Sequence, residues 1–468
     1  MAEADQLVVP LQRRAFDLHA MSLPFGPNYG DAQFITAFKS ERGGAVGAVF
    51  GTPDGRFVAL TMRRRTDHRF VLTSEVDSIP TLDDAVARLN EDMKVGQPAE
   101  PLKPGERRRP KLLDLGQRTP CAAFQLLAGG PIRWAAMNTV MELYLAMPNP
   151  DANFASDMQT VNFDSRLWEL YLFACFREMG VEVSQDVPSP DFKLVAGSLT
   201  AYVEAVTANP TEARDGSLPE LKHAPVDNVD RLAGDAAARF AKTLRSKIQK
   251  GYHDQPHVRG LPFALALADF HGGSTMVWSR EALPTYLYGK LPVVKEGESG
   301  RYAEGEPIDK LKGYDIKAGL FNDPAMCGLS AIVFSNACTM SKFNRMGVLA
   351  GLGVPGVKLR RRGILYDRTP GALEPIDFDM DVESEEYQAL WPWGEAWCVE
   401  LEVYHNPGAS HPFPFDLLPG ATHWFERDGE VVCETMWKHT VLASVTTISA
   451  PKELQNWPAR KDSESDGG

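Results

Sequence analysis

The chain has 468 residues, a net charge of −13 and an apolar fraction of 44%, values typical of a globular protein of two or three domains. It has no uncharged apolar run of about eighteen residues, so no membrane association is expected, and its acidic start lacks the apolar stretch of a secretory signal. The six cysteines show no CxxC pair or regular spacing, which argues against a disulfide framework or structural zinc and favours a cytoplasmic location.

Residues 1–150 are expected to form an accessory α+β domain. Apolar stretches in residues 44–74 alternate with turn signals at "TPDG" and "RTDH", a pattern that predicts a three-stranded meander. A helix is predicted over residues 81–93, with Thr81 as its cap. A proline-rich, charged linker follows over residues 94–111, and residues 132–150 read as a further helix that ends at its prolines.

Residues 151–340 are expected to form the central α/β domain. The stretch "NFDSRLWELYLFACFREMG" predicts a helix with Asp164 or Ser165 as N-cap and Gly180 at its end. Three short β-like runs follow, and residues 226–251 then read as a second long helix. The apolar runs "LPFALALADF" and "GLSAIVFSN" predict two fully buried strands, separated by a polar stretch over residues 272–322.

The C-terminal part, residues 341–458, is expected to be a β-rich segment. The stretch "WCVELEVYHNP" reads as a strand, and "THWFERDGEVVCETMW" reads as a hairpin that turns at "RDGE". Residues 459–468 are polar and charged and are expected to form a disordered tail.

The first candidate for chemistry is Glu169, in the helix that starts near residue 163. At helical spacing it shares a stripe with Leu172, Phe173 and Phe176. A carboxylate in an apolar stripe must be paired, protonated or bound to a cation. The simple alternative is an ion pair with Arg166, three residues earlier on the same side of the helix.

Two further carboxylates lie on neighbouring predicted strands. Asp191 follows Pro190 at the start of one strand, and Glu204 lies in the middle of the next, in "TAYVEAVT". A hairpin joining these strands is expected to bring both carboxylates to one end of the sheet. Two carboxylates and one backbone carbonyl suffice for Mg²⁺, which takes oxygen ligands and keeps several waters. Such a metal can activate water and stabilise the charge that develops on a phosphodiester.

The combined pattern resembles the PD-(D/E)xK nuclease superfamily, which has the restriction-endonuclease-like fold. The shared order is a helix that carries a Glu, then "PD", then a strand with the motif ExK, here "FDSRLWELYLFACFREMGVEV", "PDFKL" and "AYVEAVT". The resemblance implies a mixed sheet flanked by helices, Mg²⁺ or Mn²⁺ as cofactor, and phosphodiester hydrolysis on DNA, with RNA left open. It also implies Asp191, Glu204 and Glu169 as metal ligands, with the Ala205 carbonyl as an extra ligand.

The chain departs from the family motif at one position, because Val206 stands where the family has its Lys. Members of the superfamily can take this Lys from a neighbouring element, usually the next helix. The expected substitute is Lys247, which borders the buried face of the predicted helix over residues 226–251. Lys242, Lys250 and Lys193 are the other candidates.

Two other interpretations stay open. A protein without the Lys can be a catalytically inactive module that binds nucleic acid or protein, or the carboxylates can serve an unrelated hydrolase. Three arginine-rich segments are candidate phosphate contacts or ordinary surface charge: "MRRR" ending at Arg65, "ERRRPK" ending at Lys111 and "KLRRR" over 358–362. Asp269 and His271, at the end of a buried strand, are candidates to face the metal site from outside its ligands. Homo-oligomerisation stays open.

Overall fold

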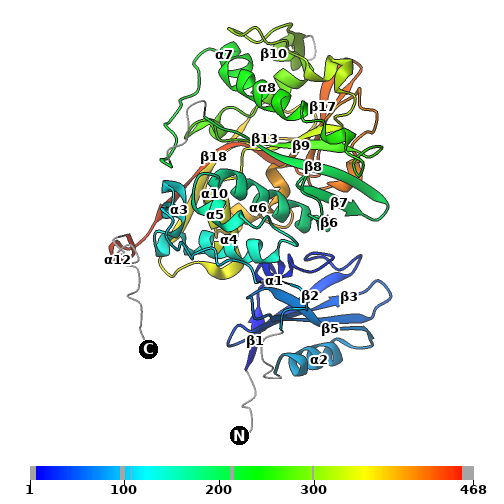
Figure 1. Ribbon diagram of the computed structural model, residues 1–468, viewed down its shortest axis with the longest axis vertical. Coiled ribbons are helices and arrows are strands. Elements are labelled where there is room, and N and C mark those ends of the chain that lie inside the picture. The colour runs from blue at the N-terminus through cyan, green and yellow to red at the C-terminus, as the bar shows by residue number, and fades with distance from the viewer. Residues whose placement is uncertain (1–6, 95–100, 107, 211–215, 298–299, 456–468) are drawn as a thin grey trace.

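The structure, a computed structural model, describes residues 7–94, 101–106, 108–210, 216–297 and 300–455. The protein is of the mixed α/β class. A small antiparallel sheet lies at one end of the molecule, and a large mixed sheet with helices on both faces forms the centre of the remaining part (Figure 1). The expected disordered tail, residues 459–468, lies outside the described residues. No helix in the described ranges is long and apolar enough to cross a membrane.

The small sheet has five strands in the order β1-β2-β3-β4-β5, with α1 on one face and α2 on the other. The predicted meander corresponds to β3–β5; the prediction missed β1 and β2, which extend it at one edge. Gly47 of β3 lets α2 approach closely, because a Cβ atom there would lie 2.4 Å from Leu89 Cδ1. The predicted helix after Thr81 is confirmed, and Thr81 Oγ1 accepts a hydrogen bond from Asp84 N. The elements are β1 (Val8–Leu11), α1 (Arg13–Ala20), β2 (Gln33–Ser40), β3 (Ala45–Gly51), β4 (Phe57–Arg64), β5 (Phe70–Ile79) and α2 (Leu82–Lys94).

The large sheet has eight strands in the order β17-β16-β15-β12-β9-β8-β7-β6. Strands β8, β9 and β12 run parallel to one another at its centre. The strands are β6 (Glu182–Ser184), β7 (Phe192–Ala196), β8 (Leu199–Ala208), β9 (Phe263–Asp269), β12 (Ala331–Ser335), β15 (Glu402–His405), β16 (Thr422–Arg427) and β17 (Glu430–Glu434). All of the strands predicted in residues 181–207, 261–270, 328–336, 397–407 and 422–437 are therefore present.

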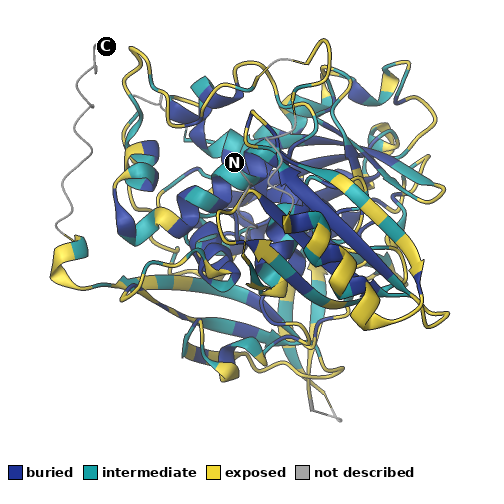
Figure 2. Ribbon diagram, turned by 90° about the horizontal axis from the view of Figure 1, so that it is seen from below, coloured by how far each residue is buried: buried dark blue, intermediate teal, exposed yellow. Residues whose placement is uncertain are grey.

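Two apolar cores cover the two faces of this sheet, and Figure 2 shows its buried strands in the interior. One face packs on α4, α6 and α10 and uses small side chains such as Ala264 and Ala266, so the helices can approach closely. The other face packs on α8 and α9 through larger side chains such as Leu265 and Leu267. The helices of this region are α3 (Ala122–Ala128), α4 (Trp134–Ala146), α5 (Phe154–Gln159), α6 (Phe163–Glu178), α7 (Asn228–Ala233), α8 (Asp235–Ile248), α9 (Ala282–Tyr288) and α10 (Met340–Gly347).

The remaining elements lie around these two layers. A hairpin, β10 with β11, follows α9, and a three-stranded sheet has the order β14-β13-β18. These elements are β10 (Lys290–Gly297), β11 (Gly300–Pro307), β13 (Lys358–Asp367), β14 (Ile376–Asp381), α11 (Glu385–Gln388), β18 (His439–Ser449) and α12 (Lys452–Gln455).

Several sequence predictions need correction in detail. The helix expected over residues 226–251 is broken at Gly234 into α7 and α8. The expected polar stretch over residues 272–322 contains α9 and the β10–β11 hairpin. Helix α6 starts after Asn162, so Asp164 and Ser165 lie inside its first turn instead of capping it. The expected domain boundaries at residues 150 and 340 do not coincide with breaks in packing, because α4 joins the core of the large sheet and β15 hydrogen-bonds to β12.

Candidate metal centre

Asp191 lies at the point where one strand of the large sheet ends beside its neighbour. Strand β7 begins at Phe192, which pairs with Val203 of β8. Beyond that pair, β8 has no partner residue in β7. The Asp191 side chain binds β8 there instead, because its Oδ2 accepts a hydrogen bond from Ala205 N at 2.7 Å. The Asp191 carboxylate is therefore held beside Glu204, the residue that precedes Ala205.

Glu204 is buried in β8 and only half of its carboxylate is hydrogen-bonded. Its Oε1 accepts hydrogen bonds from Lys247 Nζ at 2.9 Å and from Tyr252 OH at 2.6 Å. Its Oε2 is buried and has no hydrogen-bond partner among the described residues. Because a buried polar atom without a partner is costly, Oε2 is suited to receive a cation.

Glu169 is buried in α6 and forms the ion pair that the simple alternative predicts. Arg166 Nη1 lies 3.0 Å and 3.2 Å from the two carboxylate oxygens of Glu169. The same guanidinium binds Asp157, with Nη2 2.6 Å from Oδ2. Both Glu169 oxygens are thus engaged by Arg166, which links α6 to α5.

The three carboxylates influence one another. Burial, followed by the charge of Asp191, raises the pKa of Glu169 to about 8. Burial, followed by the charge of Glu204, raises the pKa of Asp191 to about 7, against the opposing effect of Lys247. The structure thus brings the three predicted residues into one group of repelling charges, which a cation would relieve.

Lys247 is the lysine that reaches this group. It extends from α8, and its side chain is 27% exposed. Lys242 and Lys250 are exposed, and Lys242 Nζ lies instead 5.4 Å from the ring centroid of Tyr314. Val206, at the family's Lys position, belongs to the apolar core beneath α8.

The three carboxylates do not form a closed set of metal ligands. Within the described ranges, no group of three or more His, Cys, Asp or Glu side chains meets the geometry for holding a metal ion. Arg166 occupies both oxygens of Glu169, so the donors that fit a hard divalent cation are Asp191, the free Oε2 of Glu204 and the Ala205 carbonyl. The chemistry of the donor set and the unpartnered oxygen fit Mg²⁺ or Mn²⁺ with two carboxylates and bound water.

One residue of the group was missed by the sequence analysis. Tyr252 follows Gly251, whose positive φ of 65° lets the chain turn back after α8. Burial and the nearby Glu204 carboxylate raise the pKa of the Tyr252 hydroxyl, so it stays a neutral hydrogen-bond donor. No spacing in the sequence connects it with Glu204, and only the turn brings the two together.

Asp269 and His271 do not lie where the sequence analysis expected them. In the parallel pair of β8 and β9, Glu204 stands opposite Leu265, whereas Asp269 stands opposite Ala208. Four residues of strand separate the two levels, or roughly 13 Å. The expectation that they face the metal site is therefore wrong.

The arginine-rich segments are largely used inside the protein. Arg64 pairs with Glu142, and Arg65 pairs with Asp67. Arg109 donates to backbone carbonyls at the end of α4, and Arg361 is buried against acidic side chains. Arg107 lies outside the described residues. These four arginines therefore serve structural roles inside the protein, whereas Arg108, Arg360 and Arg362 are exposed.

Comparisons with protein-family models, with curated proteins and with solved structures found no match.

Proposed function

We propose that this protein is a metal-dependent phosphodiester hydrolase of the PD-(D/E)xK type, with a restriction-endonuclease-like core, that acts on DNA. The observation that carries the proposal is the 2.9 Å contact between Lys247 Nζ and Glu204 Oε1. It supplies an ammonium group from the next helix, where Val206 leaves the motif incomplete. Asp191 and Glu169 complete a carboxylate group in the order of that motif.

The metal ion, Mg²⁺ or Mn²⁺, would be held by Asp191 and Glu204 with the Ala205 carbonyl. Glu169 would act on the ion indirectly, through its electrostatic interaction with Asp191. When bound, it would polarise the phosphodiester and lower the pKa of water. Asp191 is already oriented for this role by its hydrogen bond from Ala205 N. Tyr252 and Lys247 fix the rotamer of Glu204 by binding the same oxygen and leave the other oxygen open.

Lys247 and Glu169 have complementary roles in this proposal. The Lys247 ammonium would orient the attacking water and stabilise negative charge on the phosphate oxygens. Glu169, whose pKa is raised to about 8 by burial and by Asp191, holds a proton at neutral pH and would release it when a cation binds nearby. Arg166 would keep Glu169 in place while its protonation changes.

A second candidate is an inactive fold of the same kind that binds nucleic acid or protein. The observation that favours it is the complete engagement of Glu169 by Arg166, which removes one of the three expected metal ligands. A cytoplasmic location is proposed in both cases, because all six cysteines carry free thiols.

The test is cleavage of supercoiled plasmid and of end-labelled single- and double-stranded DNA, with Mg²⁺ or Mn²⁺ and with EDTA as the metal-free arm. The wild type is compared with Asp191→Ala and with Asp186→Ala, which removes an exposed carboxylate five residues earlier. We expect metal-dependent cleavage by the wild type and by Asp186→Ala, and none by Asp191→Ala. Absence of cleavage in every arm, together with DNA binding by the wild type, would favour the inactive module.

A further inference from the structure

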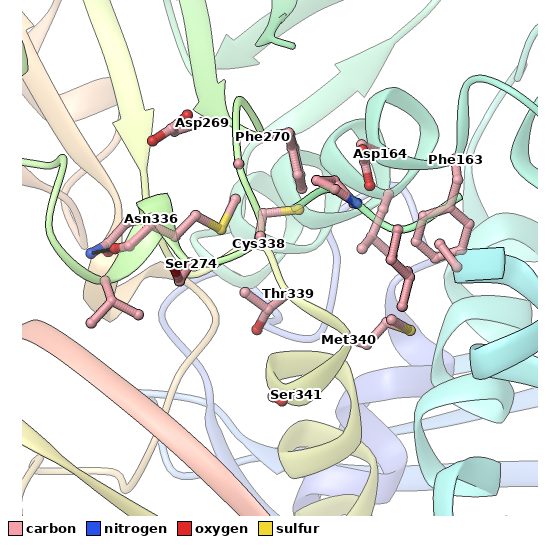
Figure 3. A pocket seen from close by; sticks show the side chains of 18 of the residues that line it. Phe163, Asp164, Asp269, Phe270, Ser274, Asn336, Cys338, Thr339, Met340 and Ser341 are labelled. Carbon is pink, nitrogen blue, oxygen red and sulfur yellow. Dashed lines mark hydrogen bonds between the residues drawn. The ribbon is translucent and has the colours of Figure 1, made fainter. Parts of the chain in front are cut away.

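A large cavity lies at the carboxyl ends of the three parallel strands of the main sheet. Its volume is about 810 Å³, within the range of small-molecule sites. Its lining includes Asp269 at the end of β9, His271 shortly after it, Asn336 after β12, and Pro210 after β8. Figure 3 shows Asp269, Asn336, Thr339 and Asp164 around this space. In open α/β sheets ligands bind at this edge. The lining does not include Asp191, Glu204, Glu169 or Lys247.

His271 lines this cavity, and one of its ring nitrogens has no hydrogen-bond partner among the described residues. Its side chain is 1% exposed, and its Nδ1 lies 2.5 Å from Asp269 Oδ1. Ser279 holds the other oxygen of Asp269. Because a carboxylate accepts hydrogen bonds, Nδ1 carries a proton, and Nε2 is the ring nitrogen left for a further hydrogen bond. Nε2 is buried without a hydrogen-bond partner among the described residues, and Asp235 Oδ2 lies 4.0 Å from it. A ligand with a hydroxyl or amino group would satisfy Nε2.

The opposite side of the cavity is built to receive an anion. Helix α10 begins here after its N-cap Thr339, and Met340 and Ser341 of its first turn line the cavity. The first backbone N–H groups of a helix have no partner within the helix, and they attract anions. Ser341 lies at the helix end shown in the lower part of Figure 3.

A buried ion cluster that includes side chains of α10 also favours an anion in the cavity. Three cationic side chains are bound to two acidic ones, namely Lys342, Arg345 and Arg361 with Glu395 and Glu400. Arg345, Arg361 and Glu400 of this cluster also line the cavity. The hydrogen-bonded cluster thus has one more positive than negative charge, which an anionic ligand would balance.

The rest of the lining suits an uncharged organic group. Phe163, Leu167, Met276 and Val441 provide apolar surface, and Asp164 provides a carboxylate acceptor. We propose that the cavity binds a phosphate monoester of a hydroxyl-bearing molecule about the size of a nucleoside monophosphate. The phosphate would lie at the start of α10, and a hydroxyl would donate to His271 Nε2. This site is separate from the carboxylate group and does not depend on the nuclease proposal.

The experiment is isothermal titration of the full chain in EDTA, which removes any metal-mediated phosphate binding. The probes are AMP, GMP, CMP and UMP, with ribose 5-phosphate, inorganic phosphate and adenosine as comparison arms. We expect saturable binding of at least one nucleoside monophosphate, at least tenfold tighter than inorganic phosphate or adenosine. Equal binding of ribose 5-phosphate would identify a sugar phosphate as the ligand and would still support the shared chemistry.

The decisive variant is Ser341→Asp. A negative charge in the first turn favours the helix but repels a bound phosphate, so the protein is expected to fold while nucleotide binding weakens at least tenfold. Thr81→Asp is the matched control, because it adds a negative charge at the start of α2, in the small sheet, and should leave binding unchanged. His271→Ala should weaken the binding of nucleoside monophosphates and ribose 5-phosphate more than the binding of inorganic phosphate.

The proposal would be overturned if the wild type bound no phosphate ester saturably, if Ser341→Asp left binding unchanged, or if Thr81→Asp weakened binding equally. Asp191→Asn should keep full nucleotide binding, and loss of binding in this variant would move the ligand to the carboxylate group and contradict the assignment to the cavity.

Discussion

Lys247 of α8 and Glu204 of β8 meet across the interface between helix and sheet, with Nζ 2.9 Å from Oε1. Lys247 lies 43 residues after Glu204 in the sequence. The packing of α8 on β8 brings the two side chains together. Val206 does not compete for this space, because it contributes to the apolar core between the same two elements. This contact predicts a catalytic role for Lys247.

Lys247→Ala should lower the rate of single-turnover DNA cleavage by roughly 10²- to 10⁴-fold, the range for loss of a group that assists proton transfer. Binding of Mn²⁺ should persist, because the variant removes a cation that competes for Glu204 Oε1. Lys242→Ala and Lys250→Ala remove exposed lysines of the same region and serve as controls. A cleavage rate unchanged by Lys247→Ala would exclude this lysine from the reaction.

The parts of this site that depend on local pattern could be predicted from the sequence. Glu169 stands out in an apolar helical stripe, Asp191 follows a proline at a strand start, and Lys247 borders the buried face of its helix. Tyr252 could not be predicted, because its contact with Glu204 depends on the turn after α8. The engagement of both Glu169 oxygens by Arg166 also depends on rotamers that the sequence does not specify.

Metal binding should depend on pH. The pKa values of Asp191 and Glu169 are raised to about 7 and about 8, so protons compete with the cation in this range. The affinity for Mn²⁺ should rise as the pH increases from about 6 to about 9, with release of protons on binding. Isothermal titration in two buffers of different ionisation enthalpy measures the released protons. The same affinity at pH 6 and pH 9 would contradict the raised pKa values.

Asp191→Asn should stabilise the metal-free protein at pH 8. A carboxyl group with a raised pKa holds a proton in the folded state that the unfolded chain has already lost, so its ionisation destabilises the fold as the pH rises from about 4 to about 8. An Asn removes the repelling charge and can still accept the hydrogen bond from Ala205 N. We expect Tm to rise by roughly 2 °C or more at pH 8 and to change little at pH 5.

Asp186→Asn, at an exposed carboxylate, is the control for this experiment and should leave Tm unchanged at both pH values. With Mn²⁺ present, the wild type should gain stability and the Asp191→Asn variant should not. A lower Tm for Asp191→Asn at pH 8 without metal would show that the carboxylate stabilises the fold as an ordinary structural group.

Arg361→Ala should destabilise the protein strongly, by about 3 to 5 kcal/mol, because it leaves a buried acidic partner without compensation. Arg361 is 1% exposed and is bound by Glu400, Tyr387 and Ser444. Arg362→Ala removes the exposed neighbour in the same strand and should have little effect. Urea denaturation of both variants measures the difference, and equal stabilities would contradict the structural role of Arg361.

The fold could be predicted more completely than its connections. The apolar runs of β9 and β12 mark them as buried strands, and the hairpin of β16 and β17 follows from its turn residues. The burial of Arg361 could not be predicted from "KLRRR". A strand that buries one arginine between exposed neighbours has the same sequence pattern as a fully exposed basic strand. The joining of β15 to β12 and the cavity beside α10 depend on contacts between segments far apart in the sequence, which composition and periodicity do not reveal.

The proposed metal centre is tested most directly by anomalous diffraction from crystals of the wild-type protein soaked in Mn²⁺ at pH 8. We expect an anomalous peak between the carboxylates of Asp191 and Glu204, at about 2.0–2.3 Å from an oxygen of each, and no such peak in Asp191→Asn crystals. A structure with Mn²⁺ bound elsewhere, and with Glu204 Oε2 still unliganded, would contradict the claim that these carboxylates form a metal centre.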